Sequence, residues 1–275
     1  MKTISNSKEK STSSISTQEK PIVAKSTIKD DSSSVKQKGQ LSLKDKIESF
    51  QGQEISLEDM FKAGVHFGHQ KSRWNPAMKD YIFTVRQGVH IIDLVKTEKN
   101  LKEAIELMRL KIDKGGQILF VGTKRQAKDI VKEAAEYCQM PYVVGRWLGG
   151  TLTNFEIIKK RIEKLSILED LQEKGELKKY TKKEQSVFNK KIERFNKRMG
   201  GIKHMKTLPV AVFVVDTVLE DLAVKEASKM GIPIIGLVGT NADPKVVDVP
   251  IPTNDDAVKS LKFLLAYIVA KIKKS

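Results

Sequence analysis

The sequence has only one cysteine, Cys138, among its 275 residues. A single thiol cannot form an intramolecular disulfide, and a structural zinc site usually needs several cysteine or histidine ligands at regular spacing. Cys138 lies where a helix over Lys124–Tyr137 is expected to end, so we interpret it as a small buried side chain. The chain therefore fits a reducing compartment, and we expect no disulfide and no structural zinc.

Long apolar runs and phosphate-binding patterns are also missing. The most apolar segment, Phe263 to Ala270, is short and lies between Lys262 and Lys271, so no run has the length of a membrane-spanning helix. Neither G-x-x-x-x-G-K-[ST] nor G-x-G-x-x-G occurs, and no serine, histidine and aspartate pattern indicates a hydrolase. The sequence therefore predicts no membrane partner and no nucleotide cofactor.

Basic residues are abundant and unevenly distributed. The chain has 50 Lys and Arg against 34 Asp and Glu, a formal net charge of +16. Residues 153–199 alone have 14 Lys and Arg against 8 acids, and residues 1–53 have 10 Lys against 6 acids. A long chain with one strongly basic segment is typical of proteins that bind RNA or DNA. The alternative is a basic surface that only keeps the protein soluble.

Residues 1–53 are the first of three expected parts. Up to about residue 40 they are rich in Ser, Thr and Lys and have few large apolar side chains, so they cannot bury enough surface to offset the entropy of ordering. We therefore expect a disordered extension, with order beginning near Ile55. The segment has acids and no arginine, which argues against an organelle transit peptide. A basic arm on RNA and a dispensable tail remain open alternatives.

Residues 54–152 and 200–275 form the second part, in which apolar and amphipathic segments alternate. The expected strands are Tyr81–Arg86, Val89–Leu94, Gln117–Val121, Pro141–Val144, Val210–Val215, Ile232–Val238 and Val247–Ile251. The expected helices begin at the capping residues Ser56, Thr97, Thr217 and Asn254, and at Lys124. Apolar strands separated by amphipathic helices predict an α/β domain with a mostly parallel sheet covered on both faces.

Residues 153–199, the third part, break this alternation. The pairs Thr153 with Glu156 and Thr181 with Glu184 have the spacing of helix capping boxes. The apolar residues that follow at helical spacing are Ile158, Ile162, Leu165, Leu168 and Leu171 in the first run, and Phe188, Ile192, Phe195 and Met199 in the second. Two such helices predict an antiparallel coiled-coil hairpin inserted into the α/β domain. Its excess of charge is of one sign, which favours phosphate binding over a merely solvated face.

The loop Gly145–Phe155 joins the sheet to this hairpin. It contains three glycines, a guanidinium and an indole, but no nucleophile and no phosphate-cradling pattern, so we interpret it as a docking loop. Together with two other basic and aromatic groups and the hairpin, it supplies the candidate RNA-binding residues. These are His69, Lys71, Arg73, Trp74, Lys124, Arg125, Arg146, Trp147, Lys159, Lys160, Arg161, Lys190, Lys191, Arg194 and Arg198.

Metal binding and catalysis are weighed against simpler interpretations. His66 and His69 lie three residues apart, but no second pair of ligands completes a site by spacing. Asp216, Asp243, Asp248, Asp255 and Asp256 fall near strand or helix ends, where carboxylates often cap helices or begin turns. We therefore predict no metal, no cofactor and no catalytic residue. An enzyme that holds a phosphate ligand with Lys124 and Asp216 is the alternative.

Seven segments stand in the order typical of one family: Ala63–Gln70, Arg73–Pro76, Tyr81–Phe83, His90–Leu94, Phe120–Lys124, Arg146–Phe155 and Asn254–Ala257. From Ile55 to Ile272 the chain closely resembles the bacterial-type family of small-subunit ribosomal protein two. The resemblance implies a flavodoxin-like three-layer domain with a coiled-coil hairpin, and no catalysis. It implies binding to small-subunit ribosomal RNA at the head–body junction, recruitment of the mRNA-binding ribosomal protein one, and a ribosome-bound place in the bacterial cytoplasm.

Three features depart from that family. The residues before Glu54 are an addition, Gly239 stands where Asp is common, and Gly145 stands where Gln is common. The two glycines affect the details of two loops and leave the family resemblance intact. A protein-interaction scaffold, whose hairpin binds a partner helix rather than RNA, is a further alternative.

Overall fold

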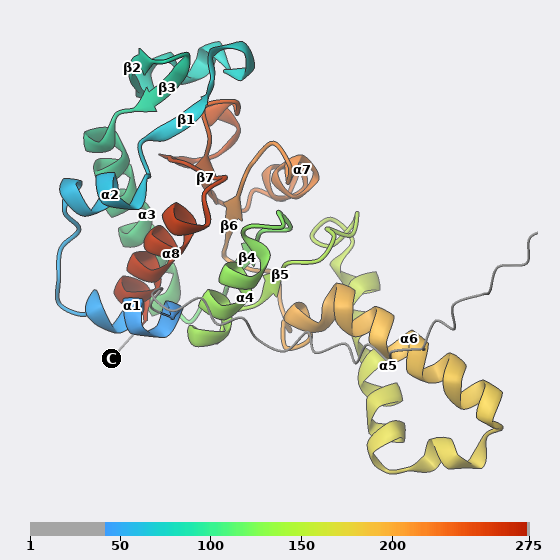
Figure 1. The fold of residues 1–275 in the computed structure, drawn as a ribbon. Coiled ribbons are helices and arrows are strands. Elements are labelled where there is room, and N and C mark those ends of the chain that lie inside the picture. The colour runs from blue at the N-terminus through green and yellow to red at the C-terminus, as the bar shows by residue number, and fades with distance from the viewer. Residues whose placement is uncertain (1–41, 274–275) are drawn as a thin grey trace, which may run out of the picture. The chain divides into compact units, whose positions relative to one another are not determined.

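The computed structural model describes residues 42–273, shown in Figure 1. Most of the expected disordered extension lies outside the described residues. The described chain begins with α1 (Leu43–Ser49), whose first turn is closed by a capping box between Ser42 and Asp45. Leu43 and Ile47 lie four residues apart on one face and are at most 1% exposed, in contact with the C-terminal helix α8 (Val258–Ile272). The prediction that order begins near Ile55 is therefore wrong.

A five-stranded parallel sheet forms the centre of the domain. Its spatial order is β5 (Tyr142–Val143), β4 (Ile118–Val121), β6 (Ala211–Val215), β7 (Ile234–Val238) and β8 (Val249–Pro252). Numbered along the chain, this is the order 2-1-3-4-5 of flavodoxin-like proteins. The five predicted strands and the predicted α/β class are confirmed.

Both faces of the sheet are covered, which is why these strands are apolar throughout. Because side chains alternate between faces along a strand, Ile118 and Phe120 pack with α1, α3 (Leu94–Asp113), α4 (Lys128–Tyr137) and α8. Leu119 and Val121 pack on the other face with α7 (Asp221–Lys229) and the start of the helical hairpin. The apolar helix α8 is a core helix, and no helix among residues 42–273 is long and apolar enough to cross a membrane.

A second, antiparallel sheet has the order β1 (Phe67–Gln70), β3 (Val89–Ile92) and β2 (Ile82–Arg86). The predicted hairpin is present, and both turn residues, Gln87 and Gly88, have positive φ angles of 50° and 76°. This is the turn conformation that matches the twist of a two-residue hairpin. Strand β1 was not predicted. Helix α2 (Leu57–Ala63) begins at the predicted cap Ser56, and the short helices η1 (Lys71–Arg73) and η2 (Pro76–Tyr81) follow β1.

Several predicted helix starts are wrong, and for Thr97, Lys124 and Glu220 the reason is that the side chain binds elsewhere. Asp93 caps α3, whereas the hydroxyl of Thr97 donates to the carbonyl of Pro252 at 2.7 Å. Helix α4 begins at Lys128 rather than at Lys124. The predicted box between Thr217 and Glu220 does not form, and α7 begins at Asp221.

The helical hairpin consists of α5 (Phe155–Glu173), the short helix η3 (Glu176–Lys179) and α6 (Lys182–Met199). Helices α5 and α6 contact each other, and α6 begins at the predicted capping box of Thr181 and Glu184. The predicted box of Thr153 and Glu156 is wrong. The apolar seam is buried near the sheet, at Ile158, Ile162, Leu165, Ile192 and Met199, and half-buried farther out, at Leu168, Leu171 and Phe188. The short helix η4 (Gly200–Ile202) returns the chain to the sheet.

The docking of α1 gives a testable consequence. Replacing the fully buried Ile47 by Ala (Ile47→Ala) removes apolar contact with α8, and we expect a loss of about 2–5 kcal/mol in the free energy of unfolding. Urea denaturation measures it, with the exposed Lys44→Ala on the same helix as the control. Equal stability of both variants and the unaltered protein would show that α1 is not part of the folded domain.

Candidate nucleic-acid interface

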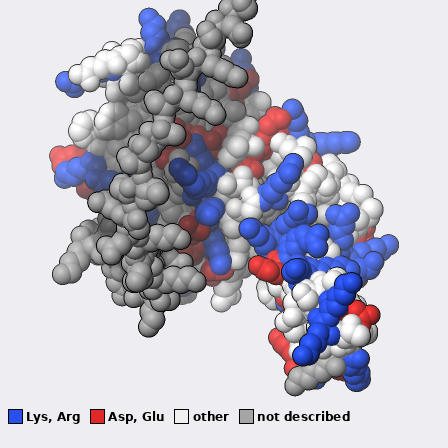
Figure 2. Space-filling view, turned by 45° about the vertical axis from the view of Figure 1, so that its right-hand side comes forward, with Lys and Arg blue, Asp and Glu red and all other residues white. Residues whose placement is uncertain are grey.

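The helical hairpin exposes the basic side chains that the sequence singled out. All seven are solvent-exposed: Lys159, Lys160 and Arg161 on α5, and Lys190, Lys191, Arg194 and Arg198 on α6. Figure 2 shows Lys and Arg gathered over the hairpin. Within residues 42–273 none of the seven takes part in an ion pair. Their charge is therefore available to an external polyanion.

A groove of about 540 Å³ lies between the two helices near their junction with the sheet. Leu148, Ile167 and Phe195 give it an apolar floor. Its basic lining consists of Arg161, Lys164, Lys191 and Arg198. Apolar floor and cationic rim together suit a nucleotide, whose base is apolar on its faces and whose phosphate is anionic.

The loop before the hairpin is held by a single buried carboxylate, that of Glu226 on α7. One of its oxygens accepts hydrogen bonds from Trp147 Nε1 at 3.1 Å and from the N–H of Gly150 at 2.7 Å. The other accepts from the N–H groups of Leu152 at 3.0 Å and Thr153 at 3.3 Å. Burial raises the pKa of Glu226, but these hydrogen bonds outweigh burial and lower the pKa below its usual value. The loop is therefore fixed to α7 by its backbone N–H groups and by the indole of Trp147.

This arrangement changes the interpretation of Trp147. Its indole is only 7% exposed and packs among the apolar side chains between the sheet and the hairpin. A ring in that position cannot stack on a base, so Trp147 positions the loop instead of contacting RNA. Arg146, its neighbour, is exposed and remains a candidate contact.

Lys124 is also occupied by the protein itself. Its Nζ lies 2.7 Å from Asp256, 2.9 Å from Asp216 and 3.5 Å from Asp255. Burial by itself lowers the pKa of Lys124, but the three carboxylates outweigh burial and raise the pKa. The charge of Lys124 is therefore used within the protein and is not free for RNA, whereas Arg125 is exposed.

The same contacts argue against the phosphate-ligand enzyme. The N–H of Thr123, at the strand end where such a ligand would bind, donates to Glu220 at 2.7 Å. Asp216, which follows β6 with a φ of 66°, accepts from the N–H groups of Val218 and Leu219. The carboxylates of the protein thus take both the cation and the backbone donors that a phosphate would need.

The last group of candidates surrounds β1 and η1. Lys71 and Arg73 are exposed, while Trp74 is half-buried against His90, with ring centroids 5.0 Å apart. His69 is half-buried and its Nε2 lies 3.1 Å from Asp256. Burial of His90 lowers its pKa, with a further contribution from Lys71. Lys71 and Arg73 thus remain free for phosphate, and the aromatic rings serve local packing.

Sequence reasoning missed Glu226, the residue on which the loop depends. Glu226 lies inside an amphipathic helix pattern, where a glutamate is ordinary, and nothing in its neighbours along the chain indicates burial. Its four partners lie more than seventy residues earlier in the chain. The sequence offers one indication: the backbone N–H groups of a loop outside helices and strands need acceptors. This does not say which residue supplies the acceptor.

The structure defines a class: a flavodoxin-like α/β protein with a helical hairpin that exposes seven basic side chains, none of which forms an ion pair within residues 42–273. The family described as Ribosomal protein S2 matches residues 60–275 of the chain. The small ribosomal subunit protein uS2 of Fusobacterium nucleatum is 49% identical to it over 219 residues, which are 79% of this chain and 89% of that protein. The chain belongs to the ribosomal protein S2 family. It is accordingly a structural ribosomal protein and not an enzyme.

The contacts of Glu226 predict that replacing one of its carboxylate oxygens by an amide nitrogen strongly destabilises the protein. In Glu226→Gln, an amide nitrogen replaces an acceptor and faces backbone donors, so we expect a loss of about 3 kcal/mol in the free energy of unfolding at neutral pH. Urea denaturation measures it, with the exposed Glu163→Gln as the control.

The pH dependence of stability tests the same interaction in a second way. The folded protein lowers the pKa of Glu226. Its stabilisation is therefore complete above the pKa of the unfolded chain and is lost as the pH falls through the folded-state pKa. The difference in stability between the unaltered protein and Glu226→Gln should narrow with acidification. A constant difference from neutral pH down to below that pKa would contradict this account.

Proposed function

We propose that this protein is a component of the small ribosomal subunit and binds its ribosomal RNA chiefly through the exposed basic face of the hairpin. The observation that carries the proposal is the set of seven exposed Lys and Arg side chains on α5 and α6 that form no ion pair with any residue from 42 to 273. The name of the Fusobacterium relative supports assembly into the small subunit. Arg146, Lys71, Arg73 and Arg125 are exposed and supply further phosphate contacts.

The burial pattern supports different roles for the α/β part and the hairpin. The α/β part, residues 54–152 and 200–273 with α1 added, is the folded support. The hairpin, residues 153–199, is the RNA-binding unit, since its outer helix faces contribute little to the core. Because each phosphate contact releases counterions, binding should weaken steeply as salt rises.

Neighbouring ribosomal proteins are proposed as the second class of partner, including recruitment of the mRNA-binding ribosomal protein one. Exposed aromatic surface supports a protein contact. His66 lies between Phe61 and Phe67, with ring centroids 4.2 and 4.0 Å away, and these two phenylalanines are 61% and 49% exposed. Rings of this kind are enriched in protein interfaces. The proposed place of action is the ribosome in the bacterial cytoplasm.

Charge removal from α6 tests the RNA contact. The triple variant Lys190→Gln, Lys191→Gln and Arg194→Gln should lower the slope of log affinity against log salt by about 3, one for each lost phosphate contact. Filter binding to small-subunit ribosomal RNA at several salt concentrations measures the slope. The matched control, Lys44→Gln, Lys128→Gln and Lys229→Gln, removes the same charge from exposed positions outside the hairpin. Equal slopes for both triple variants would refute the assignment to the hairpin.

Assembly itself is tested by sedimentation of the tagged protein from a bacterial lysate. We expect it to pellet with small subunits and to be released by RNase. If RNase left it in its complex, a scaffold that binds a partner protein would explain the hairpin better. If it stayed in the light fraction while ribosomes pelleted, the assignment to the ribosome would be lost.

A further inference from the structure

Four cations surround the groove between α5 and α6. Arg161 and Lys164 on α5, and Lys191 and Arg198 on α6, are exposed and lie at helical spacings that place each pair on one face of its helix. None of the four forms an ion pair with a residue from 42 to 273, and no acidic residue of that range lines the groove. Charges of one sign gathered in a groove attract an anionic ligand.

The acid next to the groove does not supply this anion. Glu169 follows the groove residue Leu168 on α5, but its carboxylate is paired with Lys203. It also accepts a hydrogen bond from Nδ2 of Asn196 at 2.7 Å. The four cations of the groove are therefore left for a ligand from outside the described part of the chain.

The floor of the groove is apolar and includes an aromatic ring. Ile167 and Leu168 contribute from α5, and Phe195 and Met199 from α6. Phe195 is half-buried, whereas Ile192 and Met199, its neighbours in the apolar seam of α6, are 6% and 2% exposed. The seam thus opens at Phe195. A phosphate alone needs no apolar floor, so cations above a ring favour a ligand that has both a flat apolar part and negative charge.

The loop before α5 supplies the rest of the floor. Leu148 lines the groove, and the residues beside it are fixed to Glu226. Trp147 Nε1 donates to this carboxylate at 3.1 Å, and the N–H of Gly150 donates to it at 2.7 Å. The position of this part of the groove is therefore set before a ligand binds, and a preorganised surface loses less entropy on binding than a mobile one.

The size of the groove and its surroundings favour RNA over a partner protein. Its volume of about 540 Å³ accommodates a single nucleotide. Two turns of a partner helix with their side chains would occupy roughly 1,000 Å³. Arg161, Lys191 and Arg198 also belong to the seven exposed basic side chains of the hairpin (Figure 2), so an RNA strand bound to that face passes the groove.

We propose that the groove binds one unpaired base of the RNA, which stacks on Phe195 while the neighbouring phosphates lie on Arg161, Lys164, Lys191 and Arg198. The inference rests on the proposed RNA-binding function and narrows the ligand. The hairpin recognises a nucleotide that projects from a loop or bulge, in addition to the backbone of a duplex. Stacking on an aromatic side chain is a general way in which proteins recognise unpaired bases.

Two matched phenylalanines of α6 test the stacking. Phe195→Leu keeps an apolar side chain but removes the ring from the groove, whereas Phe188→Leu removes a half-buried ring that packs against Tyr180 outside it. In filter binding to small-subunit ribosomal RNA, we expect Phe195→Leu to lower the affinity by about 5–100-fold. Phe188→Leu, and Phe195→Tyr with its ring retained, should bind as the unaltered protein does. The salt slope should be the same in all of them, because no phosphate contact is lost.

Chemical probing of the RNA bases at saturating protein separates lost stacking from a disturbed hairpin. We expect at least one unpaired base to be protected by the unaltered protein and by Phe195→Tyr, and to react in the complex with Phe195→Leu. Urea denaturation should show that Phe195→Leu and Phe188→Leu are equally stable.

Two results would overturn the base site. The first is unchanged affinity and unchanged base reactivity in Phe195→Leu. If the triple variant of α6 still lowered the salt slope, the phosphate contacts of the proposed function would stand without the base site. The second is unchanged affinity for the RNA alone together with loss of Phe195→Leu from sedimenting small subunits, which would indicate that an acidic partner protein occupies the groove.

Discussion

The hydrogen bonds of Glu226 connect the two halves of the molecule that matter for function. One carboxylate on α7 accepts five hydrogen bonds from the loop between the sheet and α5. Those donors fix the direction in which α5 leaves the sheet, and α6 follows because it packs along α5. The exposed basic face of the hairpin is thus oriented by a contact that touches no charge on that face. A flexible loop here would lose entropy on binding RNA, whereas a fixed loop has already lost it in folding.

The fold was largely predictable because its determinants are local or periodic. Apolar runs such as those around Phe120 and Phe213 indicate buried parallel strands, and the Gln87-Gly88 pair indicates a hairpin turn. The errors arose where a side chain with local capping potential binds a distant group. Thr97 bonds Pro252, and Thr153 bonds Glu226, so neither caps the helix that follows it. Helix α1 was missed because Leu43 and Ile47 form a stripe of only two residues at the edge of a polar segment.

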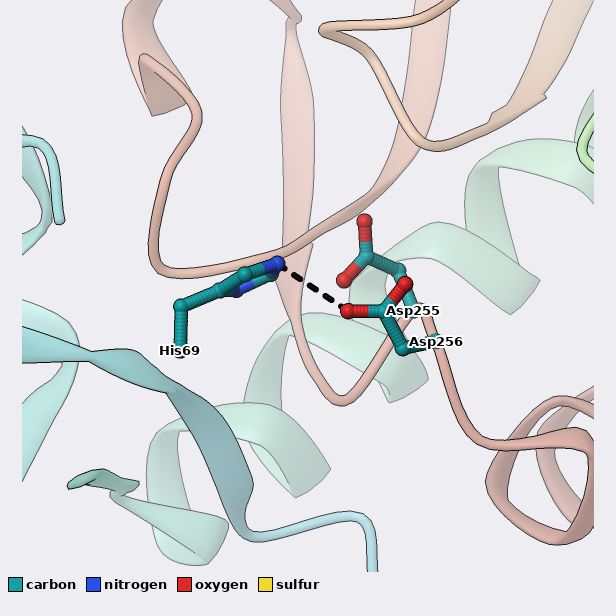
Figure 3. Close-up of side chains that lie close together, drawn as sticks. All are labelled: His69, Asp255 and Asp256. Carbon is teal, nitrogen blue, oxygen red and sulfur yellow. Dashed lines mark ion pairs between the residues drawn. The ribbon is translucent and has the colours of Figure 1, made fainter. Parts of the chain in front are cut away.

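The sequence predicted which types of residue form the RNA-binding site, but it predicted less well which individual residues contact RNA. Exposed Lys and Arg on α5 and α6 follow from charge and helical periodicity. Trp147 and Lys124 carry the same chemical groups, but Trp147 lies in the core and Lys124 is enclosed by Asp216, Asp255 and Asp256. A cation is free to bind RNA only if the fold brings no acidic side chain close to it. The order of the strands decides this, and the spacing of residues along the chain does not indicate it. His69 and Asp256 meet for the same reason: they are far apart in the sequence, and the fold brings Nε2 of His69 to 3.1 Å from the carboxylate of Asp256 (Figure 3).

The central claim is that the hairpin, held by its loop, presents α6 to ribosomal RNA. Directed hydroxyl-radical probing tests it most directly. A Cys138→Ala protein with an iron chelate tethered through Lys190→Cys is assembled into small subunits, beside a control tethered through Lys128→Cys on α4. The account predicts strong local RNA cleavage from position 190 and weak cleavage from position 128. Cleavage from position 128 alone, with position 190 silent, would contradict it.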